Sequence, residues 1–161
     1  MPVIDVTKNL DDRSITITAE FDAPVERIWQ IYADPRQLEK IWGPTEYPAT
    51  FVDHEFAPGG RVTYHMTSPE GEKYAGYWIV DTVDKPTGFT FRDGFATEDF
   101  TPIDSLPLSR NAYSFADKDG RTVATYVSTY ETVDALEKVI EMGVEEGAAQ
   151  SLNQIDGLLT I

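Results

Sequence analysis

Two histidines, His54 and His65, are the side chains whose type best suits acid–base chemistry or metal binding near neutral pH. A Pro-Gly-Gly turn at 58–60 could bring their strands side by side, and Asp53 or Glu55 could then complete a metal site or an acid–base pair. Side chains alternate between the two faces of a strand, however, and this alternation places His65 on a polar face. We therefore interpret both histidines as surface side chains.

The adjacent pair Arg92-Asp93 follows a strand expected at 89–91 and is the strongest polar candidate. If either side chain pointed into an apolar cavity, burial and its charged neighbour would shift its pKa enough for acid–base chemistry or for anchoring a ligand. An exposed ion pair at the end of a strand would contribute little. The sequence favours the exposed pair, and we retain Arg92 as the polar member of the predicted ligand contacts.

Other motifs of catalytic or cofactor-binding proteins are absent from the sequence. The turn at 58–61 lacks the longer glycine pattern and the Lys-Ser/Thr of a phosphate-binding loop, so a hairpin turn explains it better. The acidic residues at 141–146 point in different directions around a helix, which is typical of a solvated face. The chain has no cysteine, which excludes disulfides, thiolate nucleophiles and cysteine-ligated metals. The sequence therefore predicts no metal and no cofactor, assigns no catalytic residue and does not decide whether the protein is an enzyme.

Alternating polar and apolar residues predict the elements that must position these side chains. A strand at 14–21 precedes two short helices, the first beginning after Asp22-Ala23-Pro24 and the second at Asp34-Pro35. Six strands joined mostly by short turns follow, which favours antiparallel pairing. We expect them at 50–56, 61–66, 74–83, 89–91, 111–115 and 122–130, with a long loop at 94–107.

The last segment changes to the helical spacing of apolar residues. Thr132 or Asp134 could cap a helix that runs to about Leu159. About 26 residues at 1.5 Å each give a rod of roughly 39 Å, long enough to cross the whole sheet. No repeat, low-complexity tract or linker interrupts the chain, so we expect a single domain over residues 1–161.

This order of elements defines an α+β helix-grip fold, in which a long C-terminal helix crosses a curved antiparallel sheet of about seven strands. Several short stretches carry a more specific similarity: 21–29, Asp34-Pro35, Trp42-Gly43-Pro44, 58–61, Gly76, Gly120-Arg121-Thr122, Glu146-Gly147 and Leu158-Leu159. As an ordered set they cover nearly the whole chain. On these residues the chain resembles the activator of heat-shock protein 90 ATPase C-terminal-domain-like family, within the START-like (SRPBCC) superfamily.

The sequence departs from the family pattern at two places. Ile41 precedes Trp42, where the family often has two tryptophans in succession. The terminal helix reads Gly147-Ala148-Ala149, where the family often has a Gly-Trp pair. Smaller side chains on a helix that faces a cavity would either enlarge the cavity or permit closer packing, and the sequence does not choose between these outcomes.

Aromatic side chains make up 12% of the chain, and many lie on expected strands. They could line a ligand cavity or fill an ordinary core. The resemblance favours the cavity, because helix-grip proteins commonly hold an apolar ligand between sheet and helix. The predicted ligand contacts are Trp42, Tyr64, Met66, Trp78, Phe91, Arg92, Tyr113 and Met142.

Binding of a small hydrophobic or aromatic molecule is therefore the first predicted function, and the resemblance leaves two alternatives open. One is an interaction protein that stimulates a chaperone ATPase. The other is a cyclase- or hydrolase-like enzyme, whose proton-transfer residues would be Arg92, Asp93, Tyr64 or His65. Phe95 and Phe100, in the loop expected at 94–107, could cover the partner subunit of a homodimer or cap the mouth of the cavity.

The net charge of −15, from 13 Lys and Arg against 28 Asp and Glu, disfavours polyanionic partners. It repels phosphate backbones and anionic lipid, so we expect no nucleic acid and no membrane as partners. No signal peptide or run of 18 apolar residues is visible, and a cytoplasmic location is the expectation. Many of the acidic residues map to turns, to the final helix and to Glu98-Asp99, as a solvated shell would. Electrostatic steering would then admit an uncharged or cationic ligand more readily than an anionic one.

Overall fold

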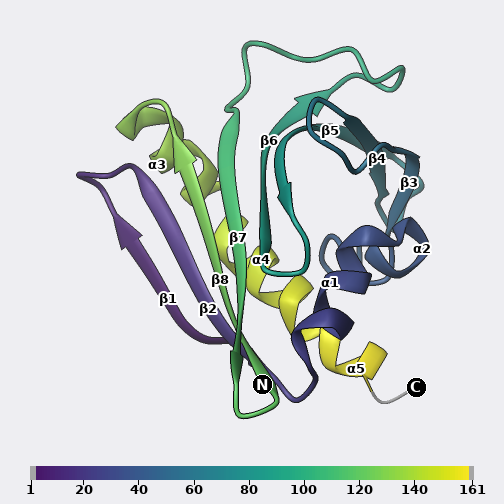
Figure 1. Cartoon of the computed structure of the whole chain (residues 1–161). Coiled ribbons are helices and arrows are strands. Elements are labelled where there is room, and N and C mark those ends of the chain that lie inside the picture. The colour runs from purple at the N-terminus through teal and green to yellow at the C-terminus, as the bar shows by residue number, and fades with distance from the viewer. Residues whose placement is uncertain (1–2, 160–161) are drawn as a thin grey trace.

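Eight antiparallel strands form one curved sheet, and helices cover its concave side (Figure 1). The computed structural model describes residues 3–159. In chain order the strands are β1 (Val3–Asn9), β2 (Ser14–Phe21), β3 (Ala49–His54), β4 (Arg61–Thr67), β5 (Lys73–Asp84), β6 (Gly88–Ala96), β7 (Ser109–Lys118) and β8 (Arg121–Tyr130). The helices are α1 (Val25–Ala33), α2 (Pro35–Leu38), α3 (Val133–Glu141), α4 (Val144–Asn153) and α5 (Ile155–Leu159). Across the sheet the strand order is β1-β2-β8-β7-β6-β5-β4-β3.

The expected α+β class and antiparallel sheet are confirmed, with one strand more than the seven predicted. The additional strand, β1, pairs with β2 and forms one edge of the sheet. Ile4 and Val6 remain exposed on it. Because this edge strand buries little, its residues lack the regular alternation of a half-buried strand, and the sequence pattern did not indicate it.

The hydrophobic core lies between the concave face of the sheet and the helices. On β2 every second residue is buried, as its alternation predicts, and α1 buries one face against β7 and β8. The buried apolar side chains are Ile15, Ile17, Ala19 and Phe21 on β2, and Val25, Ile28, Trp29, Ile31 and Tyr32 on α1. This packing fixes α1 over one half of the sheet.

The two short helices begin where the prolines indicate, but their caps differ. Pro24 is itself the N-cap residue of α1, and no side chain among the described residues caps that helix. Asp22, which could have capped it, instead lies 3.7 Å from Arg121 in an exposed ion pair. Asp34 caps α2, because its side chain accepts a hydrogen bond from the backbone N–H of Arg36.

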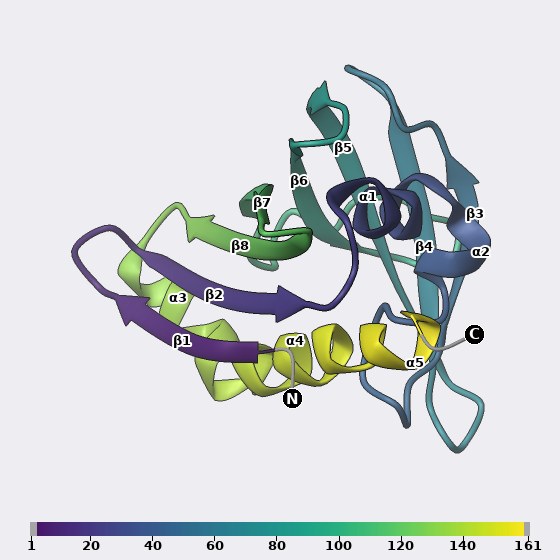
Figure 2. The same ribbon diagram turned by 60° about the horizontal axis from the view of Figure 1, so that its bottom comes forward.

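The C-terminal segment is helical but not one continuous rod, which corrects the sequence prediction. Thr132, one of the two N-cap candidates, is its N-cap and accepts a hydrogen bond from the backbone N–H of Ala135. The helix then breaks after α3, because Gly143 adopts a left-handed conformation with φ of 79°. Seen in Figure 2, α3, α4 and α5 succeed one another in a row that runs from the β1 edge of the sheet to α2. The helical spacing of apolar residues continues on both sides of the break. The sequence pattern therefore predicts a single helix.

Strand β6 is longer than its sequence pattern predicts, and the change matters for the site. It continues through Asp93 to Ala96, where a loop was expected from residue 94. Strand β7 likewise begins at Ser109 rather than at 111. The extra length places Asp93 and Ser109 opposite each other in the β6–β7 pairing. Both residues therefore belong to the sheet.

Candidate functional site

A cavity of about 320 Å³ lies between the concave face of the sheet and the C-terminal helices. Strands β2, β4, β6, β7 and β8 form one wall. The junction of α3 and α4, together with α4 itself, forms the opposite wall. The segment 41–44, which follows α2, closes one end. The chain thus encloses a space at the place where the sequence predicts a ligand.

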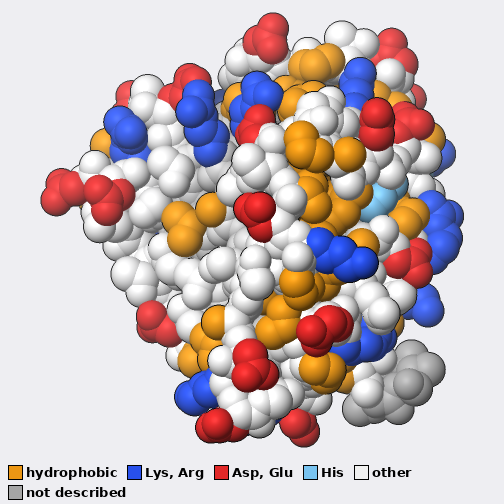
Figure 3. Space-filling view, in the orientation of Figure 1, with side chains coloured by type: hydrophobic (Ala, Val, Ile, Leu, Met, Phe, Trp, Pro, Cys, Tyr) orange, Lys and Arg blue, Asp and Glu red, His pale blue; other side chains and the backbone are white. Residues whose placement is uncertain are grey.

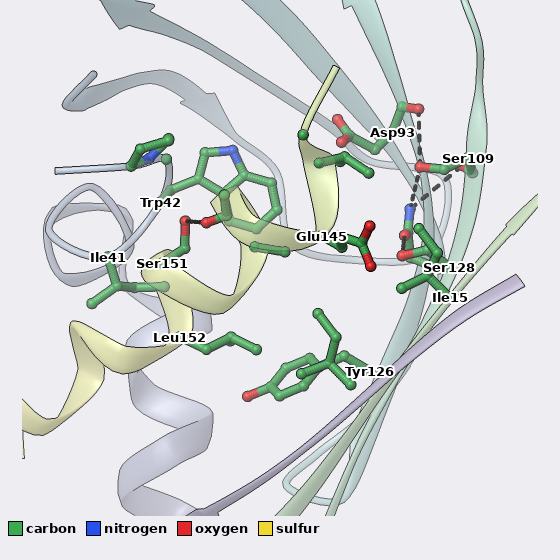
Figure 4. Close-up of a pocket in the computed structure, with 18 of the residues that line it drawn as sticks. Ile15, Ile41, Trp42, Asp93, Ser109, Tyr126, Ser128, Glu145, Ser151 and Leu152 are labelled. Carbon is green, nitrogen blue, oxygen red and sulfur yellow. Dashed lines mark hydrogen bonds between the residues drawn. The ribbon is translucent and has the colours of Figure 1, made fainter. Parts of the chain in front are cut away.

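Most of the cavity lining is apolar or aromatic. Trp42 and Leu152 lie on the helical side, and Ile15 and Tyr126 lie on the strand side (Figure 4). The small residues Gly147 and Ala148 of α4 also line the cavity. At these two positions, where the family often has Gly-Trp, the small side chains leave space instead of closing the helix onto the sheet.

A carboxyl group on β6 interrupts the apolar wall. Asp93 lies inside the cavity, and its Oδ1 accepts a hydrogen bond of 2.8 Å from the hydroxyl of Tyr64 on β4. Burial raises the pKa of Asp93 to about 7, against the hydrogen bond from Tyr64, which lowers it. Burial first, and then the neighbouring Asp93, raise the pKa of the Tyr64 hydroxyl well above its ordinary value. At neutral pH the tyrosine is therefore a hydrogen-bond donor, and the carboxyl group can gain or lose its proton.

Trp42 adds a second buried polar atom at this end of the cavity. Its indole ring meets the Tyr64 ring edge-on, with centroids 5.8 Å apart. The indole N–H lowers the pKa of the Tyr64 hydroxyl, against burial and Asp93, yet it makes no hydrogen bond of ordinary geometry with the described residues. The indole nitrogen is fully buried, so Trp42 presents its ring to the cavity and not its N–H.

A chain of hydrogen bonds crosses the wall next to Asp93. Ser128 donates to the side-chain oxygen of Asn111 at 2.6 Å, and the Asn111 amide donates to the hydroxyl of Ser109 at 3.0 Å (Figure 4). The Ser109 hydroxyl in turn donates to the backbone carbonyl of Asp93 at 3.4 Å. These contacts hold the polar side chains of β7 and β8 in one row on the concave face and anchor the row to the backbone of β6.

A pair of tyrosines lies at the deep end of the cavity. The hydroxyl of Tyr32 on α1 donates to the hydroxyl of Tyr126 on β8 at 3.0 Å. Burial is the largest cause of a raised pKa at both groups, and it also raises the pKa of Tyr113. All three phenols are therefore neutral at physiological pH and act as polar tips on an otherwise apolar surface.

The sequence-predicted contacts fall into three groups. Five of them line the cavity: Trp42, Tyr64, Met66, Tyr113 and Met142. Trp78 and Phe91 lie beneath the surface, stacked on each other with ring centroids 4.2 Å apart, and are almost wholly buried. Arg92 points to the opposite face of the sheet, where its guanidinium lies 3.2 Å from Asp81, so we no longer include it among the ligand contacts.

The histidines do not form a site with each other. In the β3–β4 pairing His54 lies across from Val62, whereas His65 lies across from Thr50. The His54 ring is 2.9 Å from the carbonyl oxygen of Tyr32, and both histidines are half-buried rather than fully on the surface. Residues 3–159 hold no group of three or more His, Asp or Glu side chains arranged to bind a metal ion.

Asp93 and the row of polar residues beside it were not predicted as ligand contacts. The alternation that places Phe89 and Phe91 on the inner face extends to Asp93 and Phe95, which both line the cavity. That signal is in the sequence, but it requires β6 to continue beyond 91. Phe95, considered for a loop over the cavity mouth, is thus part of the wall.

One face of the molecule shows how charged side chains are arranged outside the cavity (Figure 3). On the face seen in Figure 3, acidic side chains are scattered around a band of apolar ones and do not gather in one patch. No helix among the described residues is both long and apolar enough to cross a membrane. The acidic shell expected from the sequence stays a prediction.

Residues 22–160 match the model of a family described as Activator of Hsp90 ATPase homolog 1-like protein, and the chain belongs to this family. The resemblance inferred from the sequence motifs is therefore confirmed, as is the START-like (SRPBCC) fold. A comparison with curated proteins gave no match.

Several solved structures share the fold. Protein Ms6760 from Mycobacterium smegmatis is 63% identical with a TM-score of 0.91, over 98% of this chain and 97% of that one. A protein from Arthrobacter aurescens is 43% identical with a TM-score of 0.94, over 98% and 92% of the two chains. CalU16 from Micromonospora echinospora, at 15% identity and a TM-score of 0.57 over 88% and 73%, shares the fold alone.

Proposed function

We propose that the chain binds a small hydrophobic or aromatic molecule in the cavity between the sheet and α4. The observation that carries this proposal is the cavity of about 320 Å³, with apolar walls and a few polar groups. Small-molecule sites in proteins typically enclose about 300–1,000 Å³ and combine apolar walls with a few placed polar groups. The carboxyl of Asp93 and the hydroxyl of Tyr113 supply such groups.

Fluorescence titration with the neutral naphthalene dye Prodan tests this proposal. Saturable binding at one site, with a blue shift of the emission, is the expected result. Ala148→Phe places a phenyl ring where a methyl group now lines the cavity, and we expect it to weaken dye binding about tenfold or more. Gln150→Phe, which adds the same ring to the exposed side of α4, should leave dye binding unchanged. Absence of saturable binding, or equal binding by both variants, would contradict the proposal.

Four other expectations from the sequence stay predictions: the cyclase- or hydrolase-like activity, the chaperone partnership, the homodimer and the cytoplasmic location. The family description contains the name of an ATPase activator, but the cavity is the feature of this chain that we can connect with a function through its own residues.

A further inference from the structure

The charged groups that face the cavity all carry the same sign. Of the described residues, two carboxyl side chains line it, Asp93 and Glu145, and no Lys, Arg or His side chain does. Glu145 extends from the first turn of α4 into the space between that helix and the strand wall (Figure 4). It also lies 3.5 Å from Lys8, so Asp93 is the carboxyl without a cationic neighbour.

One of the two oxygens of the Asp93 carboxyl group is free to accept a hydrogen bond. Oδ1 accepts the hydrogen bond from Tyr64, whereas Oδ2 accepts no hydrogen bond from residues 3–159. An ionised carboxylate has only acceptor sites, and a buried one requires a cation or strong donors. The cavity supplies only the single tyrosine donor to this group, so a ligand with a donor or a positive charge would complete it.

The neighbouring polar side chains present few free protons to a ligand. The protons of Ser128 and of Ser109 are donated within the row of hydrogen bonds on the wall. The Asn111 amide donates to Ser109 as well. These groups therefore act toward a ligand mainly as hydrogen-bond acceptors. The hydroxyls of Tyr113 and Tyr130 can both donate and accept, so they do not determine the charge of the ligand.

The N-terminus of α4 also meets the cavity and would by itself favour an anion. Glu145 and Glu146 occupy the first turn of that helix, however, and offset its positive end. The rings of Trp42 and Tyr113 provide aromatic surface near Asp93, and aromatic faces attract cations. The net charge of −15 steers cations toward the protein and repels anions.

We propose that the cavity is selective for amphipathic aromatic amines, with the cationic nitrogen against Asp93 and the aromatic body between the strands and α4. This inference rests on the proposed function and specifies the ligand class. The ammonium group donates to the free Oδ2, and the apolar lining takes the ring. A carboxylic acid of the same size meets a cavity lining that holds two carboxyl side chains and no Lys, Arg or His.

The pH dependence follows from the groups that face Asp93. These are Tyr64 on β4, Tyr113 on β7, Tyr130 on β8 and Glu145 on α4. The phenols stay neutral, because burial is the largest cause of a raised pKa at each of them. Because the pKa of Asp93 is about 7, the carboxylate that an ammonium ion needs becomes populated as the pH rises through neutrality. Amine affinity should therefore increase between about pH 6 and about pH 8.

Three indoles of nearly equal size test the inference: tryptamine, the neutral alcohol tryptophol, and indole-3-acetate. Calorimetric titration at about pH 8 should give tryptamine the highest affinity, about tenfold or more above tryptophol, with indole-3-acetate the weakest. Asp93→Asn keeps the shape of the side chain and removes its charge, so it should abolish the preference for tryptamine over tryptophol. Asp81→Asn makes the same change of net charge on the opposite face of the sheet and should preserve the preference.

Two results would overturn the inference while leaving the proposed function intact. One is Prodan binding together with equal or weaker binding of tryptamine than of tryptophol. The other is a preference for tryptamine that survives Asp93→Asn. If neither Prodan nor any of the three indoles binds, the proposed function fails as well.

Discussion

Tyr64 lies directly across from Gly76 in the β4–β5 pairing, and its ring covers the place where a side chain at 76 would begin. A Cβ atom at Gly76 would lie 2.5 Å from Cζ of the tyrosine, far inside van der Waals contact. The absence of a side chain on β5 is what allows the hydroxyl to pass over this strand and reach Asp93 on β6. The glycine therefore belongs to the site, although it contributes no functional group.

Gly76→Ala should displace the Tyr64 ring and break its hydrogen bond to Asp93. We expect the free energy of unfolding to fall by about 1–3 kcal/mol, because a buried ring must move and a buried hydrogen bond is lost. The pKa of Asp93 should rise further, since the Tyr64 hydrogen bond holds it down. Denaturant titration measures the first effect, and carbon NMR of the Asp93 carboxyl measures the second.

Gly94→Ala is the matched control on the other face of the sheet. There a Cβ atom would lie 2.8 Å from the ring of Tyr77, which lies across from Gly94 in the β5–β6 pairing. This variant should also lose stability but keep the hydrogen bond between Tyr64 and Asp93. If Gly76→Ala retains both the stability and the Asp93 titration of the wild type, the tyrosine does not depend on the glycine.

Asp93 should make the stability of the protein depend on pH in the direction opposite to that of a salt-bridged carboxylate. Its pKa is about 7 in the folded chain and 3.8 in the ordinary case, so between these values the folded state holds one proton more. The contribution to stability is then full below about pH 4 and is lost as the pH rises to about 7. The raised pKa corresponds to a decrease of up to about 4 kcal/mol in the free energy of unfolding between these two pH values.

The comparison of wild type with Asp93→Asn isolates this contribution from the many other carboxylates. The difference in free energy of unfolding, wild type minus variant, should decrease from about pH 4 to about pH 7 and then stay constant. Urea denaturation at closely spaced pH values gives the curve. A difference that is flat over this range would mean that Asp93 titrates as an exposed carboxyl.

The tyrosine pair at the deep end of the cavity should show coupling in a double-mutant cycle. Tyr32→Phe and Tyr126→Phe each remove one partner of the 3.0 Å hydrogen bond, and each should cost about 1 kcal/mol of stability. The double variant should cost less than the sum, because the second change has no hydrogen bond left to break. Tyr74→Phe, at an exposed tyrosine, should change stability by less than about 0.5 kcal/mol. Strict additivity of the two buried changes would exclude a stabilising hydrogen bond.

The fold could be predicted from the sequence because its signals are local and regular. The alternation along β2 and the Asp34-Pro35 helix start both reappear in the structure as expected. The exposed edge strand β1 could not be predicted, because nothing in its burial imposes a pattern. What decides such an element is its pairing with β2, a contact between strands that residue spacing does not reveal.

The site was harder to predict because it depends on where strands end and on which rings pack beneath others. Alternation alone gives Trp78 and Phe91 the same inward direction as Tyr64, and only their mutual stacking removes them from the cavity surface. Asp93 shares that direction too. The sequence names Asp93 as a candidate anchor only if its side chain enters a cavity, and the structure meets this condition because β6 extends past Asp93 while Arg92 lies on the outer face.

The break between α3 and α4 distinguishes the structure from the continuous helix that the apolar spacing predicts. Gly143 has a φ of 79°, a conformation that costs a residue with a side chain roughly 1–2 kcal/mol. Gly143→Ala should therefore lower the free energy of unfolding by about this amount, although a Cβ atom would meet nothing within 4 Å.

Gly157→Ala is the matched control, because Gly157 lies inside α5 without a left-handed backbone and a Cβ atom there would also meet nothing within 4 Å. Alanine is the better helix former, so this variant should gain up to about 1 kcal/mol. Thermal and urea denaturation followed by circular dichroism measures both effects. Opposite signs for the same substitution would show that backbone conformation, not space, sets the break. A gain in stability and helical signal from Gly143→Ala would instead mean that α3 and α4 join into one rod over the cavity.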